Sequence, residues 1–220
     1  VKPHPQIDAL APPRVAVLIG GNSRHHTFTE SDVENLIAGL ARLVDEDGAS
    51  LMITASRRTP EPLKRRLEQL AASGNCLLWD GSGENPYHAY LALADAIVVT
   101  CDSVNMVSEA CSTGKPVYIV RLPGGDGSKF SDFHTGLVEA GQARFFDNRL
   151  DTWSPVPLRE TERIAREVRR RMGLDEPIVV QFGVWLGNVL TGDFGHSIST
   201  GQAVLPLIVD RFRISATIVL

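Results

Sequence analysis

The stretch RVAVLIGGNS, residues 14–23, decides the fold of this chain. Its residues 15–19 form an unbroken apolar run, rich in β-branched residues, that stops at two glycines, a pattern typical of a buried strand that ends in a tight turn. Four similar runs follow, and the segments between them place apolar residues at helical spacing. Because the strands do not alternate apolar and polar residues, we expect a parallel sheet that helices cover on both faces. The expected strands are residues 14–19, 50–54, 76–79, 96–100 and 116–120, and the expected helices between them are residues 29–44, 60–72, 86–94 and 104–113.

This alternation predicts a doubly wound α/β fold with a Rossmann-like parallel sheet of five to six strands. With the strand order 3-2-1-4-5, the first and fourth strands are neighbours where the order reverses, and ligands bind there, outside the carboxyl ends of the strands. Two further helices are expected near residues 132–140 and 159–172. We expect a Pro-rich linker at residues 1–13, the α/β domain at residues 14–172, and a short, mainly helical appendage at residues 173–220, where the alternation stops.

Composition narrows the classes of function. The chain has 220 residues, 43% of them hydrophobic, and a formal net charge of -4, so it has enough apolar residues for a core and no excess of positive charge to attract nucleic acid. Cys76, Cys101 and Cys111 form no CxxC pair and no zinc spacing, which favours reduced thiols, a cytoplasmic location and no metal site. No apolar run is long enough for a complete membrane span. The chain starts without Met and stops within an apolar run, so we expect a fragment.

Polar loops follow the first two strands. Residues 20–23, Gly-Gly-Asn-Ser, suit close approach of the backbone to a phosphate, and the alternative is a tight turn without a ligand. Residues 56–59, Ser-Arg-Arg-Thr, suit clamping of a phosphate or a carboxylate. Alternatively, they form a solvated basic loop that pairs with Glu61 or Glu68.

The loops after the third and fourth strands add an aromatic ring and carboxylates. Asn85 can cap a helix whose first residue is Pro86, which leaves the Tyr87 ring to stack on a base. Asp102 or Ser103 can cap the next helix. The candidate ligand-binding residues are Gly21, Asn22, Ser23, Ser56, Arg57, Arg58, Thr59, Glu84, Asn85, Tyr87, Asp102, Ser103, Met106, Ser108 and Glu109.

Glu109 has two interpretations. A carboxylate just inside this helix can accept hydrogen bonds from a ribose diol, as acidic groups do in nucleotide-binding folds, or it can lie on a solvated helix face. The chain has no GxGxxG fingerprint and no GxSxG motif. No catalytic residue is assigned, and no resident cofactor is expected.

Several of these segments occur in a characteristic order. They are VLIGGNS at residues 17–23, TASRRT at 54–59, GSGENPY at 81–87, TCDSVNMVSEA at 100–110, TGKPV at 113–117, KF at 129–130 and FH at 133–134. Together they resemble the mitochondrial-fission (elongated-mitochondria) family over about 170 residues. Its bacterial members are often labelled nucleoside-diphosphate-sugar epimerases, but this chain lacks the YxxxK pair that such epimerases use for proton transfer.

The resemblance implies a glycosyltransferase-B-like protein of two Rossmann-like halves, of which this chain supplies the second. By that analogy the ligand is a nucleotide-sugar, with Glu109 at the ribose and Gly21, Ser23, Ser103 and Ser108 at the diphosphate. The missing N-terminal half would be a partner and would carry the acceptor site and any general base, so this fragment is expected to be inactive alone. The alternative is a non-catalytic interaction protein on the same scaffold, because plant members are implicated in recruiting the organelle division machinery.

The last 48 residues resemble a different family. MGLDEP at residues 172–177, VQF at 180–182, WLG at 185–187, TGDFGHSI at 191–198 and PLIVDR at 206–211 are similar to segments of dipeptide and oligopeptide ABC-transporter permeases. In those inner-membrane proteins this stretch lies outside the membrane between the first two spans, which implies membrane or transporter contact. We therefore expect a truncated or chimeric reading frame. We also expect helices at residues 175–191 and 203–213 that pack loosely and expose apolar side chains.

Overall fold

The computed structural model describes residues 5–72, 74–79, 81–124, 129–151, 153–156, 158, 160–197 and 201–219. The chain divides into two compact units, Val1–Leu158 and Arg159–Leu220. The sequence places the boundary at about residue 172, where the alternation of strands and helices stops, whereas the compact units separate at residue 158. The helix at residues 160–171 therefore belongs to the second unit by its contacts.

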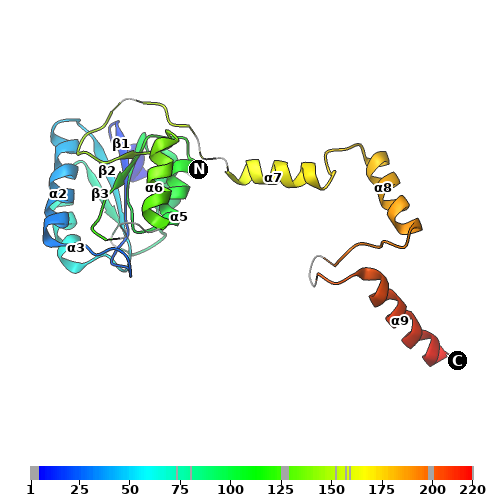
Figure 1. The fold of residues 1–220 in the computed structure, drawn as a ribbon. Coiled ribbons are helices and arrows are strands. Elements are labelled where there is room, and N and C mark those ends of the chain that lie inside the picture. The colour runs from blue at the N-terminus through cyan, green and yellow to red at the C-terminus, as the bar shows by residue number, and fades with distance from the viewer. Residues whose placement is uncertain are drawn as a thin grey trace. The chain divides into compact units, whose positions relative to one another are not determined.

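The first unit is built on a six-stranded parallel sheet in the order β3-β2-β1-β4-β5-β6 (Figure 1). This order confirms the predicted doubly wound fold and places β1 between β2 and β4, with Val17 opposite Ile53 on one side and Val98 on the other. The sixth strand is a two-residue extension beyond β5. The strands are β1 Arg14–Ile19, β2 Ser50–Ala55, β3 Cys76–Trp79, β4 Ala96–Thr100, β5 Val117–Val120 and β6 Arg144–Phe145.

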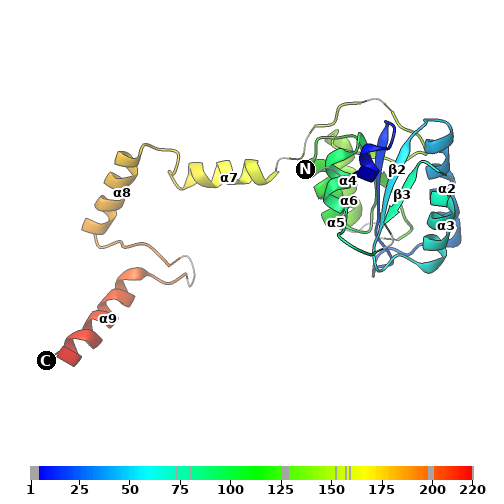
Figure 2. The same ribbon diagram turned by 180° about the vertical axis from the view of Figure 1, so that it is seen from behind.

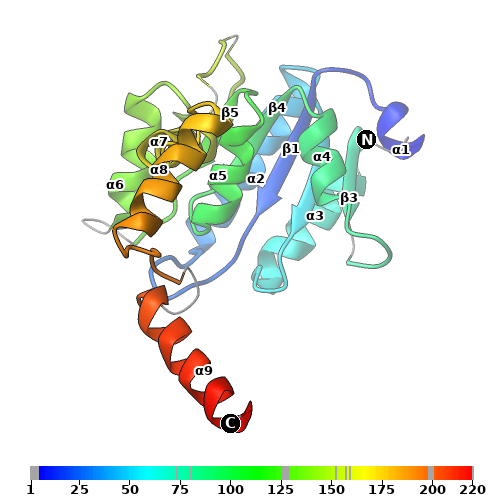
Figure 3. The ribbon, with the colours of Figure 1, turned by 90° about the vertical axis from the view of Figure 1, so that its right-hand side faces the viewer.

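Helices cover both faces of this sheet. Helices α2 and α3 lie on one face, and α4, α5 and α6 lie on the other (Figures 1 and 2). Figure 3 views the sheet from the side of α4 and α5. Helix α6 begins three residues before the expected position, and Asp132, on which that expectation was based, lies in its first turn. The helices are α2 Glu30–Asp45, α3 Glu61–Ala72, α4 Tyr87–Leu93, α5 Val104–Ser112 and α6 Lys129–Glu139.

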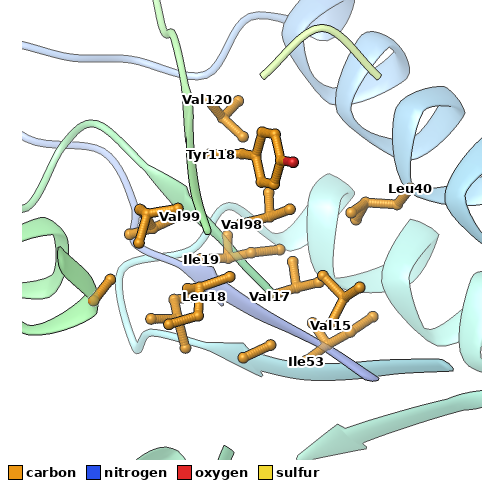
Figure 4. Packing of buried hydrophobic residues seen from close by; sticks show 14 of the residues in the cluster. Val15, Val17, Leu18, Ile19, Leu40, Ile53, Val98, Val99, Tyr118 and Val120 are labelled. Atoms are coloured by element: carbon orange, nitrogen blue, oxygen red, sulfur yellow. The ribbon is translucent and has the colours of Figure 1, made fainter. Parts of the chain in front are cut away.

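The core lies between the sheet and these helices. Side chains of β1, β2, β4 and β5 pack together with Leu40 of α2, and all of them are almost completely buried (Figure 4). Thr29 begins α2 with a capping box, because its side chain accepts from the Asp32 backbone and the Asp32 carboxylate accepts from the Thr29 backbone. The expected N-terminal linker contains a short helix, α1 Pro5–Asp8, whose Ile7 is fully buried. That segment therefore contributes to the core.

The second unit contains three helices and no buried side chain at residues 162–197 and 201–214. Helix α8 begins at Ile178 rather than at residue 175, because Pro177 disfavours helical backbone in the residue before it. Helix α9 extends past residue 213, since neither glycine nor proline interrupts it there. In the described part of the chain, no helix is both long and apolar enough to cross a membrane. The helices are α7 Glu160–Arg171, α8 Ile178–Leu190 and α9 Val204–Val219.

Candidate functional site

The loops after β1 and β4 are joined by a buried carboxylate. The Gly21 amide donates to Asp102 Oδ2 at 2.9 Å, and the Thr100 hydroxyl donates to Asp102 Oδ1 at 2.6 Å. The Gly20 amide in turn donates to Thr100 Oγ1 at 2.8 Å. The Asp102 side chain has 0% exposure. Asp102 thus fixes the glycine loop at the point where the strand order reverses, with an internal partner on each carboxylate oxygen.

The loop after β2 packs against the same glycines. The Asn22 amide donates to the Arg58 carbonyl at 3.3 Å, and the Thr59 hydroxyl donates to the Gly20 carbonyl. A Cβ atom at Gly20 would overlap the Asp102 carboxylate, and one at Gly21 would overlap the Arg58 carbonyl. Glycine is therefore required at both positions by the close approach of neighbouring loops, and three loops converge on one point.

Gly21→Ala should destabilise the first unit by about 1–3 kcal/mol, because the added methyl group overlaps backbone that cannot rotate away. The matched control is Gly136→Ala in α6, where a Cβ atom meets nothing within 4 Å. This control should stabilise the helix by roughly 0.5–1 kcal/mol. Urea unfolding followed by circular dichroism measures both. Equal effects of the two variants would show that the loops do not constrain Gly21.

The side chains of Asn22 and Ser23 shape their own loop. Asn22 Oδ1 accepts from the Phe28 amide at 3.0 Å. Ser23 Oγ accepts from the amides of His25 and His26 at 3.2 and 3.1 Å. These hydrogen bonds give both side chains a role in stabilising the loop. A contact of either side chain with a ligand stays a prediction.

The two arginines after β2 differ in their surroundings. Arg58 places Nη2 3.9 Å from Asp102 Oδ2, while more than half of its side chain is exposed. Arg57 is exposed, and its guanidinium has no ion pair among the described residues. The alternative pairing with Glu61 or Glu68 does not occur among the described residues, and Glu61 instead lies 3.9 Å from Arg65 of its own helix. Both guanidinium groups are therefore accessible to an anion.

A cavity of about 580 Å³ lies beside this loop, between α3 and the ends of β2 and β3. It brings together three of the predicted residues, Ser56, Arg57 and Asn85. Trp79 also lines it and is held by its indole NH, which donates to the Ser82 carbonyl at 2.7 Å. Trp79, Lys64 and Glu68 were not among the predicted residues, although an indole at the carboxyl end of a strand was a usable signal.

Helix α5 carries the remaining predicted residues. Ser103 is its N-cap and accepts from the Met106 amide at 3.4 Å, so of the two expected caps Ser103 is the one used. Met106 and Ser108 are partly buried, and Glu109 is exposed. Thr100, which connects Gly20 with Asp102, was missed by the sequence analysis; a hydroxyl in the last position of the central strand β4 was its only signal.

Tyr87 and Glu109 form a hydrogen bond between α4 and α5. The Tyr87 hydroxyl donates to Glu109 Oε2 at 2.5 Å. The Asn85 side chain accepts from the Tyr87 amide at 3.0 Å, but Pro86 is the N-cap, one residue later than expected. Burial, and then the hydrogen bond to Glu109, raise the pKa of Tyr87 well above its usual value, so the phenol remains a donor at neutral pH. Glu84 is exposed on the preceding loop.

Two buried histidines lie in the loop after β1 and in α6. His26 and His134 are 5% and 4% exposed, and the Nε2 atom of each has no hydrogen-bond partner among the described residues. Burial, followed by the neighbouring His26, lowers the pKa of His134. Burial also raises the pKa of the Cys101 thiol to about 11, which makes it a poor nucleophile. The described residues contain no group of three or more side chains that could hold a metal ion.

Comparison with known proteins identifies the family of this chain. The family model described as mitochondrial fission ELM1 matches residues 1–172. The chain belongs to the mitochondrial fission ELM1 family. Within this family, mitochondrial fission protein ELM1 of Arabidopsis thaliana is 36% identical over 175 residues, which are 77% of this chain and 40% of the plant protein. This ELM1-family chain therefore spans about two fifths of that relative.

The fold of this ELM1-family member also occurs in a solved structure. The structure is that of a Listeria monocytogenes protein provisionally named as a UDP-N-acetylglucosamine 2-epimerase, with a TM-score of 0.51 and 13% identity over 67% of this chain and 37% of that one. At such low identity the match shows the doubly wound, Rossmann-like fold alone.

The C-terminal segment matches a different class of protein. A probable peptide ABC transporter permease of Sinorhizobium fredii is 45% identical over 53 residues. The match covers 24% of this chain and 17% of the permease, so the similarity is partial. The ELM1 family model ends at residue 172.

Proposed function

We propose that the α/β unit binds a nucleoside-diphosphate sugar across the carboxyl ends of β1, β2 and β4. The observation that carries this proposal is the convergence of the loops containing Gly20–Gly21, Arg58–Thr59 and Asp102 where the strand order reverses. This is the position at which open α/β sheets bind their ligands. The glycines allow a close approach of the backbone, and the two arginine side chains supply positive charge for a diphosphate.

Three groups of residues would contact different parts of the proposed ligand. Arg57 and Arg58 would contact the diphosphate, since both are exposed beside the glycine loop. Glu109 would accept from the ribose diol, and the cavity lined by Trp79 and Asn85 has room for further parts of the ligand.

Calorimetry with UDP-glucose, UDP-N-acetylglucosamine and GDP-mannose tests the proposal. We expect at least one of them to bind, and Glu109→Ala to weaken that binding by more than about tenfold, the factor that corresponds to about 1.4 kcal/mol. Glu139→Ala, at an exposed position at the end of α6, is the matched control and should leave affinity unchanged. If the folded chain gives no heat of binding with any of the three, the result contradicts the proposal.

A non-catalytic interaction protein is the second candidate. The plant relative is named for mitochondrial fission, which favours a partner other than a sugar nucleotide. Under this alternative Glu109→Ala leaves partner binding intact. The permease-like segment supports a third candidate, a transporter component, which predicts recovery of the chain in a membrane fraction.

A further inference from the structure

We infer that Tyr87 is a positioning residue that holds the Glu109 carboxylate ready for a ribose diol. This inference rests on the proposed function and assigns to Tyr87 a role other than stacking on a base. Its basis is the hydrogen bond of 2.5 Å from the Tyr87 hydroxyl to Glu109 Oε2, which connects the first residue of α4 to α5.

Glu109 needs such a partner because it is exposed. A free glutamate side chain samples several rotamers, and ordering it upon ligand binding would weaken affinity. Among the described residues, the Tyr87 hydroxyl is the hydrogen-bond donor to this carboxylate. It engages one oxygen and leaves Oε1, together with the second lone pair of Oε2, to accept from two neighbouring hydroxyl groups.

Tyr87 is itself held in place. Its amide donates to the Asn85 side chain at 3.0 Å, and its ring packs on the hydrophobic core. The ring also lies nearly perpendicular to that of the adjacent His88, with ring centroids 5.3 Å apart. Because a phenol with a raised pKa stays protonated, the carboxylate faces a donor rather than a second negative charge.

The geometry also argues against base stacking by Tyr87. Stacking needs a free ring face and tolerates any orientation of the hydroxyl. Here the ring is partly buried against the core and the hydroxyl is committed to a carboxylate. The chemical class that this arrangement recognises is a vicinal diol, and the aromatic ring that lines the neighbouring cavity is Trp79.

The test uses Tyr87→Phe, which keeps the ring and removes the hydroxyl. The ligands are uridine diphosphate and guanosine diphosphate, each compared with its 2′,3′-dideoxy form. We expect Tyr87→Phe to weaken binding of the preferred ribonucleotide by about tenfold, which corresponds to about 1.4 kcal/mol, and binding of its dideoxy form by less than about twofold. In a Glu109→Ala background, Tyr87→Phe should have no further effect.

A merely structural role would give a different pattern. An equal loss for the ribose and dideoxy ligands, or no loss for either, overturns the positioning role while leaving nucleotide binding in place. A loss that persists in the Glu109→Ala background overturns it as well. Failure of the wild-type chain to bind either diphosphate overturns both the proposed function and this inference.

Discussion

Asp102→Ala should lower the free energy of unfolding of the α/β unit by about 3–6 kcal/mol, because it removes two hydrogen bonds to a charged acceptor worth about 1.5–3 kcal/mol each. The Gly21 amide and the Thr100 hydroxyl would both lose their acceptor inside the protein. Urea unfolding of the purified chain measures the change. A loss of this size exceeds that of most single substitutions.

Two variants define what this experiment measures. Asp45→Ala, at the exposed end of α2, should change stability by no more than about 0.5 kcal/mol. Asp102→Asn keeps one acceptor oxygen and should fall between the other two. If Asp102→Ala is as stable as Asp45→Ala, the buried carboxylate does not hold the loops together.

Limited trypsin digestion should remove the second unit and leave the first one intact. Helix α7 presents an arginine-rich sequence, and no described side chain of this unit at residues 162–197 and 201–214 is buried. Local opening at such sites costs little free energy, so cleavage there precedes cleavage in the α/β unit. We expect the first cuts within α7, upstream of residue 172, where the sequence places the domain boundary. Mass spectrometry of the fragments locates them.

A chain that ends at Leu158 is the matched comparison. Its α/β unit should have the same melting temperature as in the full chain, since the first compact unit ends at that residue. Equal resistance of residues 159–220 and the α/β unit to trypsin would contradict this expectation. A large fall in melting temperature after truncation would show that the two parts stabilise each other.

The sequence predicted the sheet well because each strand has a local signature. Residues 15–19, for example, are apolar throughout, and two glycines follow this run. The start of α8 was placed three residues too early, because the pattern of apolar residues ignored the effect of Pro177 on its predecessor. The N-terminal residues looked like a linker, since the burial of Ile7 depends on partners distant in sequence.

The sequence predicted which loops lie at the candidate site, but not which of their residues contact one another. The topology alone placed the loops after β1 and β4 side by side. The bond between Gly21 and Asp102 joins residues 81 positions apart, and no local pattern predicts such a bond. The orientation of the Tyr87 side chain could not be predicted from a local motif either, because its hydrogen-bond partner Glu109 belongs to another helix.

The position of β1 at the centre of the sheet has a consequence during translation. Its two neighbours are β2, which follows closely in the chain, and β4, which begins at residue 96. At synthesis rates of about 5–20 residues per second, roughly 4–16 seconds pass between the synthesis of β1 and that of β4. Throughout that interval the backbone N–H and C=O groups along its second edge are unpaired and can pair with other chains. The nascent chain thus leaves one side of its central strand unpaired until β4 has been synthesised.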